Sequence, residues 1–210
     1  FFCATNSARI CYDYMKMFRT NATGNYKQLI RQIATHPAMM YYLNNQANSN
    51  TAPDENFARE VMELFMLGNN SGTTYSQNDV VQVAKLLSGW RVQNLNQPNT
   101  TTTFVPNLHD YSSKQFSGFF DNTIIAGTGA SELDAFVDMI FSKNTMVAQH
   151  ICRRLYRFFF YYYIDENVEA NIIQPLAQIF IQNNWEILPV LKVLFKSEYF
   201  YDLANRGVMI

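Results

Sequence analysis

Apolar residues recur at helical spacing along most of this 210-residue chain, and one segment interrupts the pattern. Side chains three and four residues apart share one face of an α-helix, so this spacing predicts amphipathic helices packed on a common core. We therefore expect a mainly α fold, a multi-helix bundle-like domain. The expected helices cover residues 7–19, 26–34, 38–44, 55–67, 77–88, 131–142, 144–160, 166–183 and 185–196.

The interruption covers residues 91–130, where Thr, Asn, Gly and Pro are frequent and helical periodicity is lost. Residues 101–105 are typical of a strand, and residues 114–120 are expected to pair with it as a small β-hairpin. We predict a single domain over residues 1–210. It would consist of N-terminal helices (1–90), a hairpin and loop excursion (91–130) and C-terminal helices (131–210).

Several residues mark expected helix ends. Ser76 is expected to cap the helix that follows it, and Ser131 is expected to form a capping box with Asp134 three residues later. His36, directly before a proline, is interpreted as a turn or cap residue. Pro175 predicts a kink, or a boundary between two shorter helices, because proline lacks the N–H that an internal helical turn needs.

Composition excludes some classes of protein. Apolar residues make up 48% of the chain, which is enough for a sizeable core. A net charge of −1 argues against a nucleic-acid-binding protein, which would carry a basic surface. No apolar run reaches the roughly 18–20 residues that span a bilayer. Cys3, Cys11 and Cys152 are expected to be buried thiols. Cys3 and Cys11, if on one helix, lie about 12 Å apart, too far for a disulfide.

The helix expected over residues 55–67 combines an apolar face with an unusual density of polar side chains. Asn56, Glu60 and Glu63 form one stripe, and Glu55, Arg59 and Glu63 are also spaced by four. One interpretation is an arginine held between two acids. A second is a buried polar network in which Glu60 and Asn56 bind loop backbone groups.

A third interpretation is catalytic. His109 and Asp110, from the irregular segment, would lie against Glu60 and Glu63. A histidine and carboxylates can hold a divalent metal that activates water, or a glutamate can act as general base beside the histidine. The catalytic candidates are therefore Glu60, Glu63, His109 and Asp110, and the metal-ligand candidates are Glu60, Glu63 and His109. Lys114 would neutralise an anionic substrate group. The His-Glu-x-x-His zinc motif is absent, and the sequence identifies no cofactor.

The aromatic run at residues 158–163 has two interpretations: the end of a core helix, or a patch that docks a partner or glycan. The chain has no glycine-rich phosphate loop in a strand–helix context. It also lacks the Gly-x-Ser-x-Gly elbow of serine hydrolases.

Taken together, these segments resemble the bacterial domain-of-unknown-function 1800 family over nearly the whole chain. The residues that carry the resemblance are His36-Pro37-Ala38-Met39, Tyr42-Leu43-Asn44, Glu55-Asn56-Phe57-Ala58-Arg59-Glu60, Glu63-Leu64, Leu67-Gly68, Tyr75, Asp79-Val80, Ala84, Ser88-Gly89-Trp90, Phe104, His109-Asp110, Lys114, Gly118, Arg154-Leu155-Tyr156-Arg157-Phe158-Phe159, Leu194 and Ser197-Glu198-Tyr199-Phe200.

The resemblance implies the C-terminal part of a larger bacterial protein that is exported to the periplasm, cell surface or medium. Many members are encoded beside a sulfatase- or phosphatase-like protein, and no activity is established for the family. Many members have Asn at the position of Asp54 and His at that of Phe65, so a site using that histidine would be altered here. We favour a binding or structural module for a protein partner or surface polymer. The alternative is a hydrolase-like enzyme using the Glu/His/Asp candidates, with or without a metal.

Overall fold

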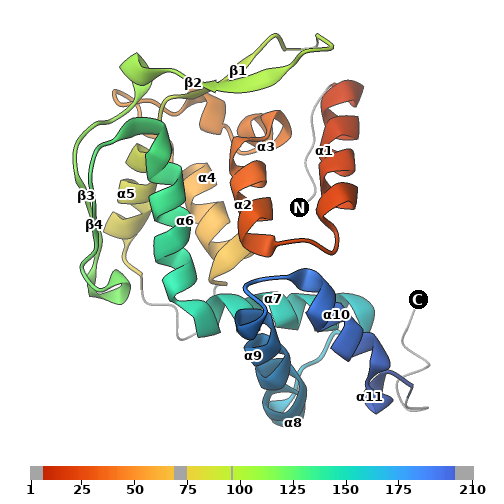
Figure 1. The fold of residues 1–210 in the computed structure, drawn as a ribbon. Helices are drawn as coiled ribbons and strands as arrows, with labels where there is room; N and C mark the ends of the chain where they lie inside the picture. Colours follow the sequence, from red (N-terminus) through yellow and green to blue (C-terminus); the bar gives the residue numbers. More distant parts are fainter. Residues whose placement is uncertain (1–6, 69–74, 96, 202–210) are drawn as a thin grey trace.

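The computed structural model describes residues 7–68, 75–95 and 97–201 and is mainly helical, which confirms the predicted fold class. Figure 1 shows an upper body that carries the N-terminal helices and both strand pairs, above a lower body of C-terminal helices. The first helices are α1 (Ala8–Asn21), α2 (Tyr26–Thr35), α3 (Pro37–Tyr42), η1 (Asn45–Ala47), α4 (Glu55–Glu60), the π-helical η2 (Val61–Met66) and α5 (Gln77–Leu86). The later ones are α6 (Glu132–Ser142), α7 (Asn144–Phe159), α8 (Glu166–Val168), the π-helical η6 (Glu169–Ile173), α9 (Gln174–Gln182), α10 (Ile187–Lys196) and α11 (Glu198–Tyr201).

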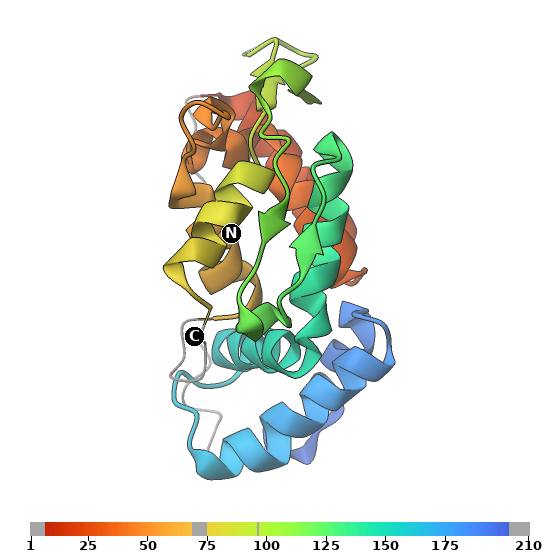
Figure 2. The same ribbon diagram turned by 90° about the vertical axis from the view of Figure 1, so that its left-hand side faces the viewer.

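The strands form two separate antiparallel pairs. β1 (Trp90–Gln93) pairs with β2 (Thr101–Phe104), and β3 (Lys114–Gln115) pairs with β4 (Ile124–Ile125). The predicted pairing of residues 101–105 with 114–120 is therefore wrong. After β2 the chain enters the 3-10 helix η3 (Pro106–Leu108) and then places His109 in the interior, so it does not turn back on β2. Figure 2 shows β3 and β4 between α5 and α6.

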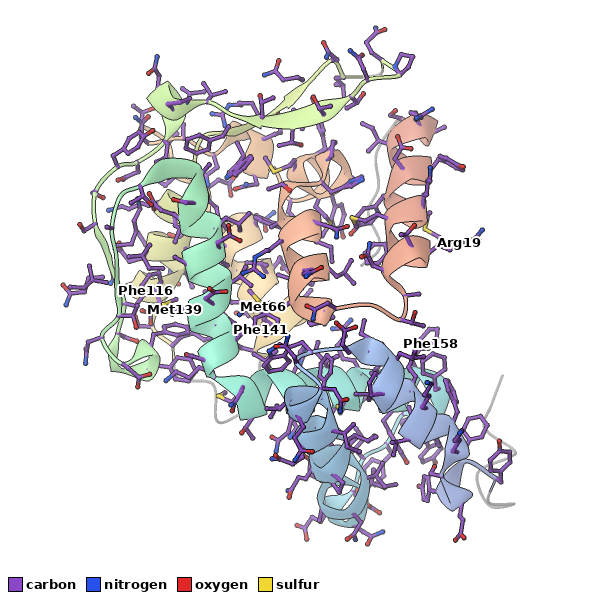
Figure 3. All side chains as sticks on the ribbon, in the orientation of Figure 1. Arg19, Met66, Phe116, Met139, Phe141 and Phe158 are labelled. Atoms are coloured by element: carbon purple, nitrogen blue, oxygen red, sulfur yellow. The ribbon has the colours of Figure 1, made fainter. Side chains whose placement is uncertain are left out.

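Residues 91–130 also contribute to the hydrophobic core. The buried cluster extends from Ile10 of α1 to Leu194 of α10, and it includes Phe116 and Phe120 of the irregular segment. Figure 3 shows Phe116 with Met139 and Phe141 inside the molecule. The segment therefore packs as part of the core.

Within the described residues, no helix is both long enough and apolar enough to cross a bilayer.

The caps of α5 and α6 differ. Ser76 and Asp79 form a capping box at the start of α5, as the sequence indicates. The capping box predicted for Ser131 and Asp134 is wrong, because Ser131 has helical dihedral angles and its side chain makes no cap hydrogen bond. The 3-10 turn η5 (Gly129–Ser131) leads directly into α6, so Ser131 lacks the extended backbone of a capping residue. Asp134 instead forms an ion pair with Arg31 of α2.

The boundary predicted at Pro175 is present. Proline lies in the first turn of α9, directly after the π-helical η6, so the predicted long helix is interrupted there. Cys152 is a buried thiol, as expected, and burial raises its pKa to about 12. Cys11 is only partly buried, so the expectation of a buried thiol is wrong there. Cys3 lies outside the described residues.

His36 caps α3, which confirms its predicted role. Its Nδ1 accepts a hydrogen bond from the Ala38 N–H at 3.1 Å. Partial burial lowers the pKa of His36 below 6.5, although Asp13 opposes this shift. The unfolded chain therefore binds this proton more tightly than the folded chain. The resulting stability is complete above pH 6.5 and is lost as the pH falls from there toward the folded-state pKa.

We expect the free energy of unfolding to decrease on acidification below pH 6.5, and to decrease less in His36→Asn. Asparagine is a good N-cap that does not titrate, so the variant keeps the hydrogen bond at every pH. Urea unfolding of both proteins over a pH series measures the difference. Equal slopes in the two proteins would remove His36 as the source.

Candidate functional site

A charged network lies in the interior where α5, the irregular segment and α6 meet. His109 Nε2 lies 2.8 Å from Glu132 Oε1, and Lys114 Nζ lies 2.7 Å from Glu132 Oε2. The side chains of all three residues are 0% exposed. Lys114 and Glu132 Oε2 form an ion pair without the geometry of a directed hydrogen bond. The Lys114 ammonium donates a hydrogen bond to the Asp110 carbonyl oxygen. We call His109, Lys114 and Glu132 the buried triad.

Close backbone packing positions the buried triad. Gly89 has a φ of +88°, and a Cβ there would lie 3.0 Å from His109 Cβ and 3.1 Å from the Val105 carbonyl oxygen. At Gly127 a Cβ would lie 1.9 Å from the Tyr111 carbonyl oxygen. Glycine at both positions lets the segment that carries His109 fit tightly between its neighbours.

The hydrogen bonds of His109 fix its proton positions. Nδ1 lies 2.9 Å from the Ser88 carbonyl oxygen, which can only accept, so Nδ1 carries a proton. Nε2 faces Glu132 Oε1, which also accepts the Gly129 N–H at 2.9 Å. One proton therefore joins Nε2 and Oε1, and both ring nitrogens of His109 are engaged.

Ser88, His109 and Glu132 superficially resemble a Ser–His–acid triad. Ser88 Oγ lies 3.4 Å from His109 Nδ1, but it donates to the Lys85 carbonyl oxygen at 2.5 Å and accepts the Asp110 N–H at 2.9 Å. A nucleophilic serine would need its proton aimed at an unprotonated ring nitrogen. Here the hydroxyl and the ring both bind backbone groups instead, so the arrangement joins segments of chain and does not activate the serine.

Asp110 binds within its own turn and has no contact with the His109 ring. Its carboxylate accepts hydrogen bonds from the N–H and hydroxyl of Ser112. Partial burial alone would raise the pKa of Asp110, but these bonds and the charges of Lys114 and Lys85 hold it below its usual value. Asp110 is thus an ionised turn residue at the edge of the network.

The polar residues of α4 and η2 form a separate group on the surface. Arg59 lies 3.3 Å from Glu55 and 3.9 Å from Glu63, and it donates to Gln77 Oε1 at 2.8 Å. Asn56 Nδ2 donates to the Leu43 carbonyl oxygen at 3.3 Å. This group holds α4 against α5 and the end of α3.

Glu63 also accepts a hydrogen bond from Tyr75. Burial and this carboxylate together raise the pKa of Tyr75. The Glu60 side chain forms no hydrogen bond or ion pair with any described residue, although Glu60 is part of α4. No contact there joins Glu60 or Glu63 to His109, and the described residues contain no group of three His, Cys, Asp or Glu side chains arranged to hold a metal. A catalytic or metal-binding role for the two glutamates stays a prediction, and the contacts assign His109 other partners.

The π-helical η2 exposes backbone carbonyl groups to side chains of other helices. The Leu67 N–H donates to the Met62 carbonyl oxygen five residues back, at 2.7 Å. The Leu64 carbonyl oxygen accepts from His150 Nε2 at 3.0 Å and from Arg154 at 3.2 Å. The Phe65 carbonyl oxygen accepts from the buried Tyr26 hydroxyl at 2.5 Å. These bonds connect η2 to α7 and α2, and they use polar groups that a regular helix would pair internally.

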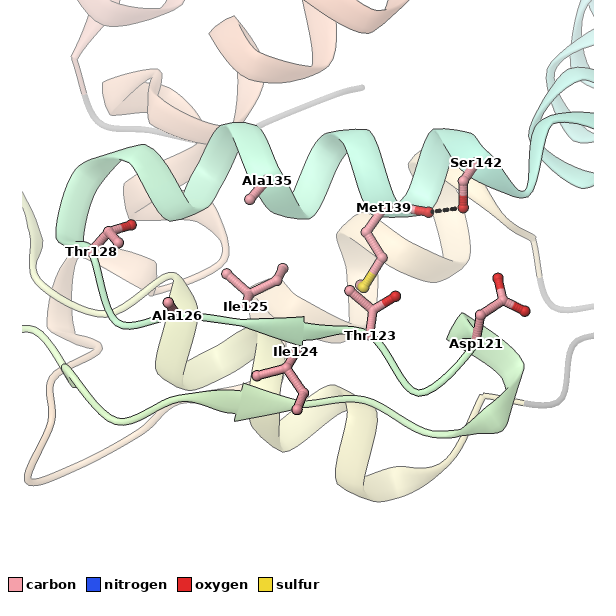
Figure 4. Close-up of a pocket in the computed structure, with 9 residues that line it drawn as sticks. All are labelled: Asp121, Thr123, Ile124, Ile125, Ala126, Thr128, Ala135, Met139 and Ser142. Atoms are coloured by element: carbon pink, nitrogen blue, oxygen red, sulfur yellow. Dashed lines mark hydrogen bonds between the residues drawn. The ribbon is translucent and has the colours of Figure 1, made fainter.

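A groove of about 590 Å³ lies between α6 and β4 (Figure 4). Ile124, Ile125 and Met139 supply apolar walls. Its one lining carboxylate, Asp121, forms an ion pair with Lys143 at 2.8 Å. None of the buried triad lines this groove, so the groove does not connect the triad to solvent.

Sequence analysis missed the residues that organise the interior. Glu132 pairs with both other members of the buried triad. The buried Asp79 joins α5 to Ser117. Asn45 and Asn48, also buried, bind carbonyl oxygens at the end of α5. The only signal for Glu132 was its place in an apolar helix start, where an acid also favours the helix dipole.

The chain matches, over residues 1–210, the family described as Protein of unknown function (DUF1800). It belongs to the DUF1800 family. Neither a curated protein nor a solved structure matches the chain significantly. In this DUF1800 chain, the residues that carried the resemblance include Ser88, Gly89, His109 and Lys114, which build or adjoin the buried triad.

Proposed function

We propose that this chain is a non-catalytic binding or structural module of an exported bacterial protein. The observation that carries the proposal is the burial and mutual pairing of the buried triad. Catalytic groups need access to a substrate, and Lys114, His109 and Glu132 have no exposed side-chain surface. Polar groups paired in this way stabilise and specify an interior.

Exposed aromatic residues supply the binding part of the proposal. Phe160 is buried, whereas Phe158 is 80% exposed, Tyr162 is 72% exposed and Tyr163 is 59% exposed. The aromatic run therefore divides between the core and the surface. Large apolar side chains grouped on a surface are typical of interaction sites. Export enters the proposal from the family resemblance, and fractionation of the producing cells tests it.

The catalytic alternative can be tested without knowing a substrate. We expect the purified protein to hydrolyse chromogenic carboxylate, phosphate and sulfate esters no faster than Glu60→Ala does, with Mg²⁺, Mn²⁺ or Zn²⁺ or with a chelator. Glu60 has no described partner, so this variant should change the free energy of unfolding by less than about 0.5 kcal/mol and remain folded.

Elemental analysis after exposure to these ions and dialysis completes the test. We expect no stoichiometric metal that depends on Glu60. Metal-dependent turnover by the wild-type protein, lost in the folded Glu60→Ala variant, would overturn the non-catalytic proposal.

A further inference from the structure

We propose that the C-terminal end of α7 and the loop after it form a docking surface for an acidic segment of a partner protein. The inference rests on the proposed binding role and names the surface and the partner chemistry. We call Arg154, Arg157, Phe158 and Tyr162 the α7 surface. Arg154 lies three and four residues before Arg157 and Phe158, so the three share one helix face. Arg157 Nε donates to the Tyr162 carbonyl oxygen at 3.3 Å, which places the loop beside that face.

The α7 surface carries positive charge that the described residues do not neutralise. Arg153, on the same helix, forms a two-pronged ion pair with Glu169 through contacts of 2.6 and 2.8 Å. Arg154 and Arg157 are exposed and form no ion pair with any described residue. An acidic partner would form ion pairs with these two arginines, as Glu169 does with Arg153.

The pKa of the neighbouring His150 also responds to the positive charge of the arginines. Its pKa is lowered mainly by burial, against the Leu64 hydrogen bond, and further by the charges of Arg154, Arg153 and Arg157. These three arginine charges all come from α7 itself. The potential around this part of α7 is therefore positive.

Both arginines are already oriented. Arg154 binds the Leu64 carbonyl oxygen and Arg157 binds that of Tyr162, each through one nitrogen. The other N–H groups of each guanidinium stay available, and a guanidinium can bind a carboxylate with two parallel hydrogen bonds. Side chains held before binding lose less conformational entropy on binding, which favours affinity.

The composition of the α7 surface favours a protein over other polyanions. Exposed Phe158 and Tyr162 stand beside the arginines, and protein interfaces are enriched in aromatic residues and arginine. Figure 3 shows the Phe158 side chain at the margin of the molecule. Nucleic-acid sites need a wider basic footprint than two arginines on a chain of net charge −1.

The test uses a glutamate–tyrosine copolymer as the probe, with polygalacturonate and single-stranded DNA as competing polyanions and a lysine–tyrosine copolymer as the opposite-charge control. We expect the whole chain to bind the glutamate–tyrosine copolymer most tightly, and more weakly as salt screens the charges. Arg154→Glu with Arg157→Glu should weaken binding about tenfold or more, because the contacts become repulsive. Phe158→Ala with Tyr162→Ala should weaken it by about tenfold.

Lys192→Glu with Lys196→Glu is the matched control, since it makes the same charge change at exposed positions of α10. We expect it to change affinity by less than about twofold. Equal weakening in this control, tighter binding of polygalacturonate or DNA, or no binding of any probe would each overturn the inference. Tighter polygalacturonate binding through the arginines would leave the binding role standing. Turnover that depends on Glu60 would instead remove the proposed function itself.

Discussion

Glu132→Ala should lower the free energy of unfolding by about 3–5 kcal/mol, because it leaves a buried lysine and a buried histidine without their carboxylate. Glu132 accepts from Gly129, pairs with Lys114 and shares a proton with His109, and none of these groups can reach water in the folded chain. Urea or thermal unfolding, followed by circular dichroism, measures the loss.

Asp134→Ala is the control for this prediction, since it removes an acid from the same helix. Its ion pair with Arg31 is on the surface, so we expect a loss of about 0–1 kcal/mol. In a Lys114→Met background, Glu132→Ala should cost less than in the wild type by about 1–3 kcal/mol, because the lysine charge is no longer stranded. A loss below about 1 kcal/mol for Glu132→Ala alone would show that the interior does not depend on the buried triad.

Asp79→Ala should lower the free energy of unfolding by about 3 kcal/mol, the second largest effect that we expect. Asp79 Oδ1 accepts from the Ser117 N–H at 2.7 Å, and Oδ2 accepts from the Ser117 hydroxyl at 2.7 Å. Oδ2 also accepts from the N–H and hydroxyl of Ser76. The substitution removes the Asp79 half of the capping box of α5 and the connection between α5 and the irregular segment together.

Asn78→Ala, one residue earlier and exposed, should change stability by less than about 0.5 kcal/mol. Amide hydrogen exchange adds a local measurement to the unfolding curves. Asp79→Ala should accelerate exchange at Ser117 and Phe120 more than in α10. Equal acceleration throughout the chain would mean that Asp79 stabilises the whole fold without a special connection to this segment.

The helices could be predicted because their spacing and caps are local properties. His36, Ser76 and Pro175 act on backbone groups within a few residues, so the sequence contains both partners. The strand pairing could not be predicted in this way. The sequence pattern suggested residues 114–120 as the partner of residues 101–105, whereas β2 pairs with β1.

The polar site shows the same division between local and distant partners. Arg59 lies between Glu55 and Glu63 on one helix, a pairing that spacing alone suggested. The partner of His109 is Glu132, 23 residues away, and no period connects them. The sequence pattern therefore suggested Glu60 and Glu63 as partners of His109, and a catalytic role for these two glutamates stays a prediction. Which acid meets a histidine across a fold depends on the route of the backbone, which Gly89 and Gly127 permit.

The π-helical turn of η2 has a consequence for the length of related chains. A π turn accommodates one residue more than a regular helix within the same rise, so Val61–Met66 behaves like an α-helix with a single insertion. A chain shortened by one residue here should close the ordinary four-residue hydrogen bonds and withdraw the Leu64 carbonyl oxygen. His150 and Arg154 would then lose their shared acceptor. One-residue deletions at this turn should therefore accompany changes at the α7 positions that bind it.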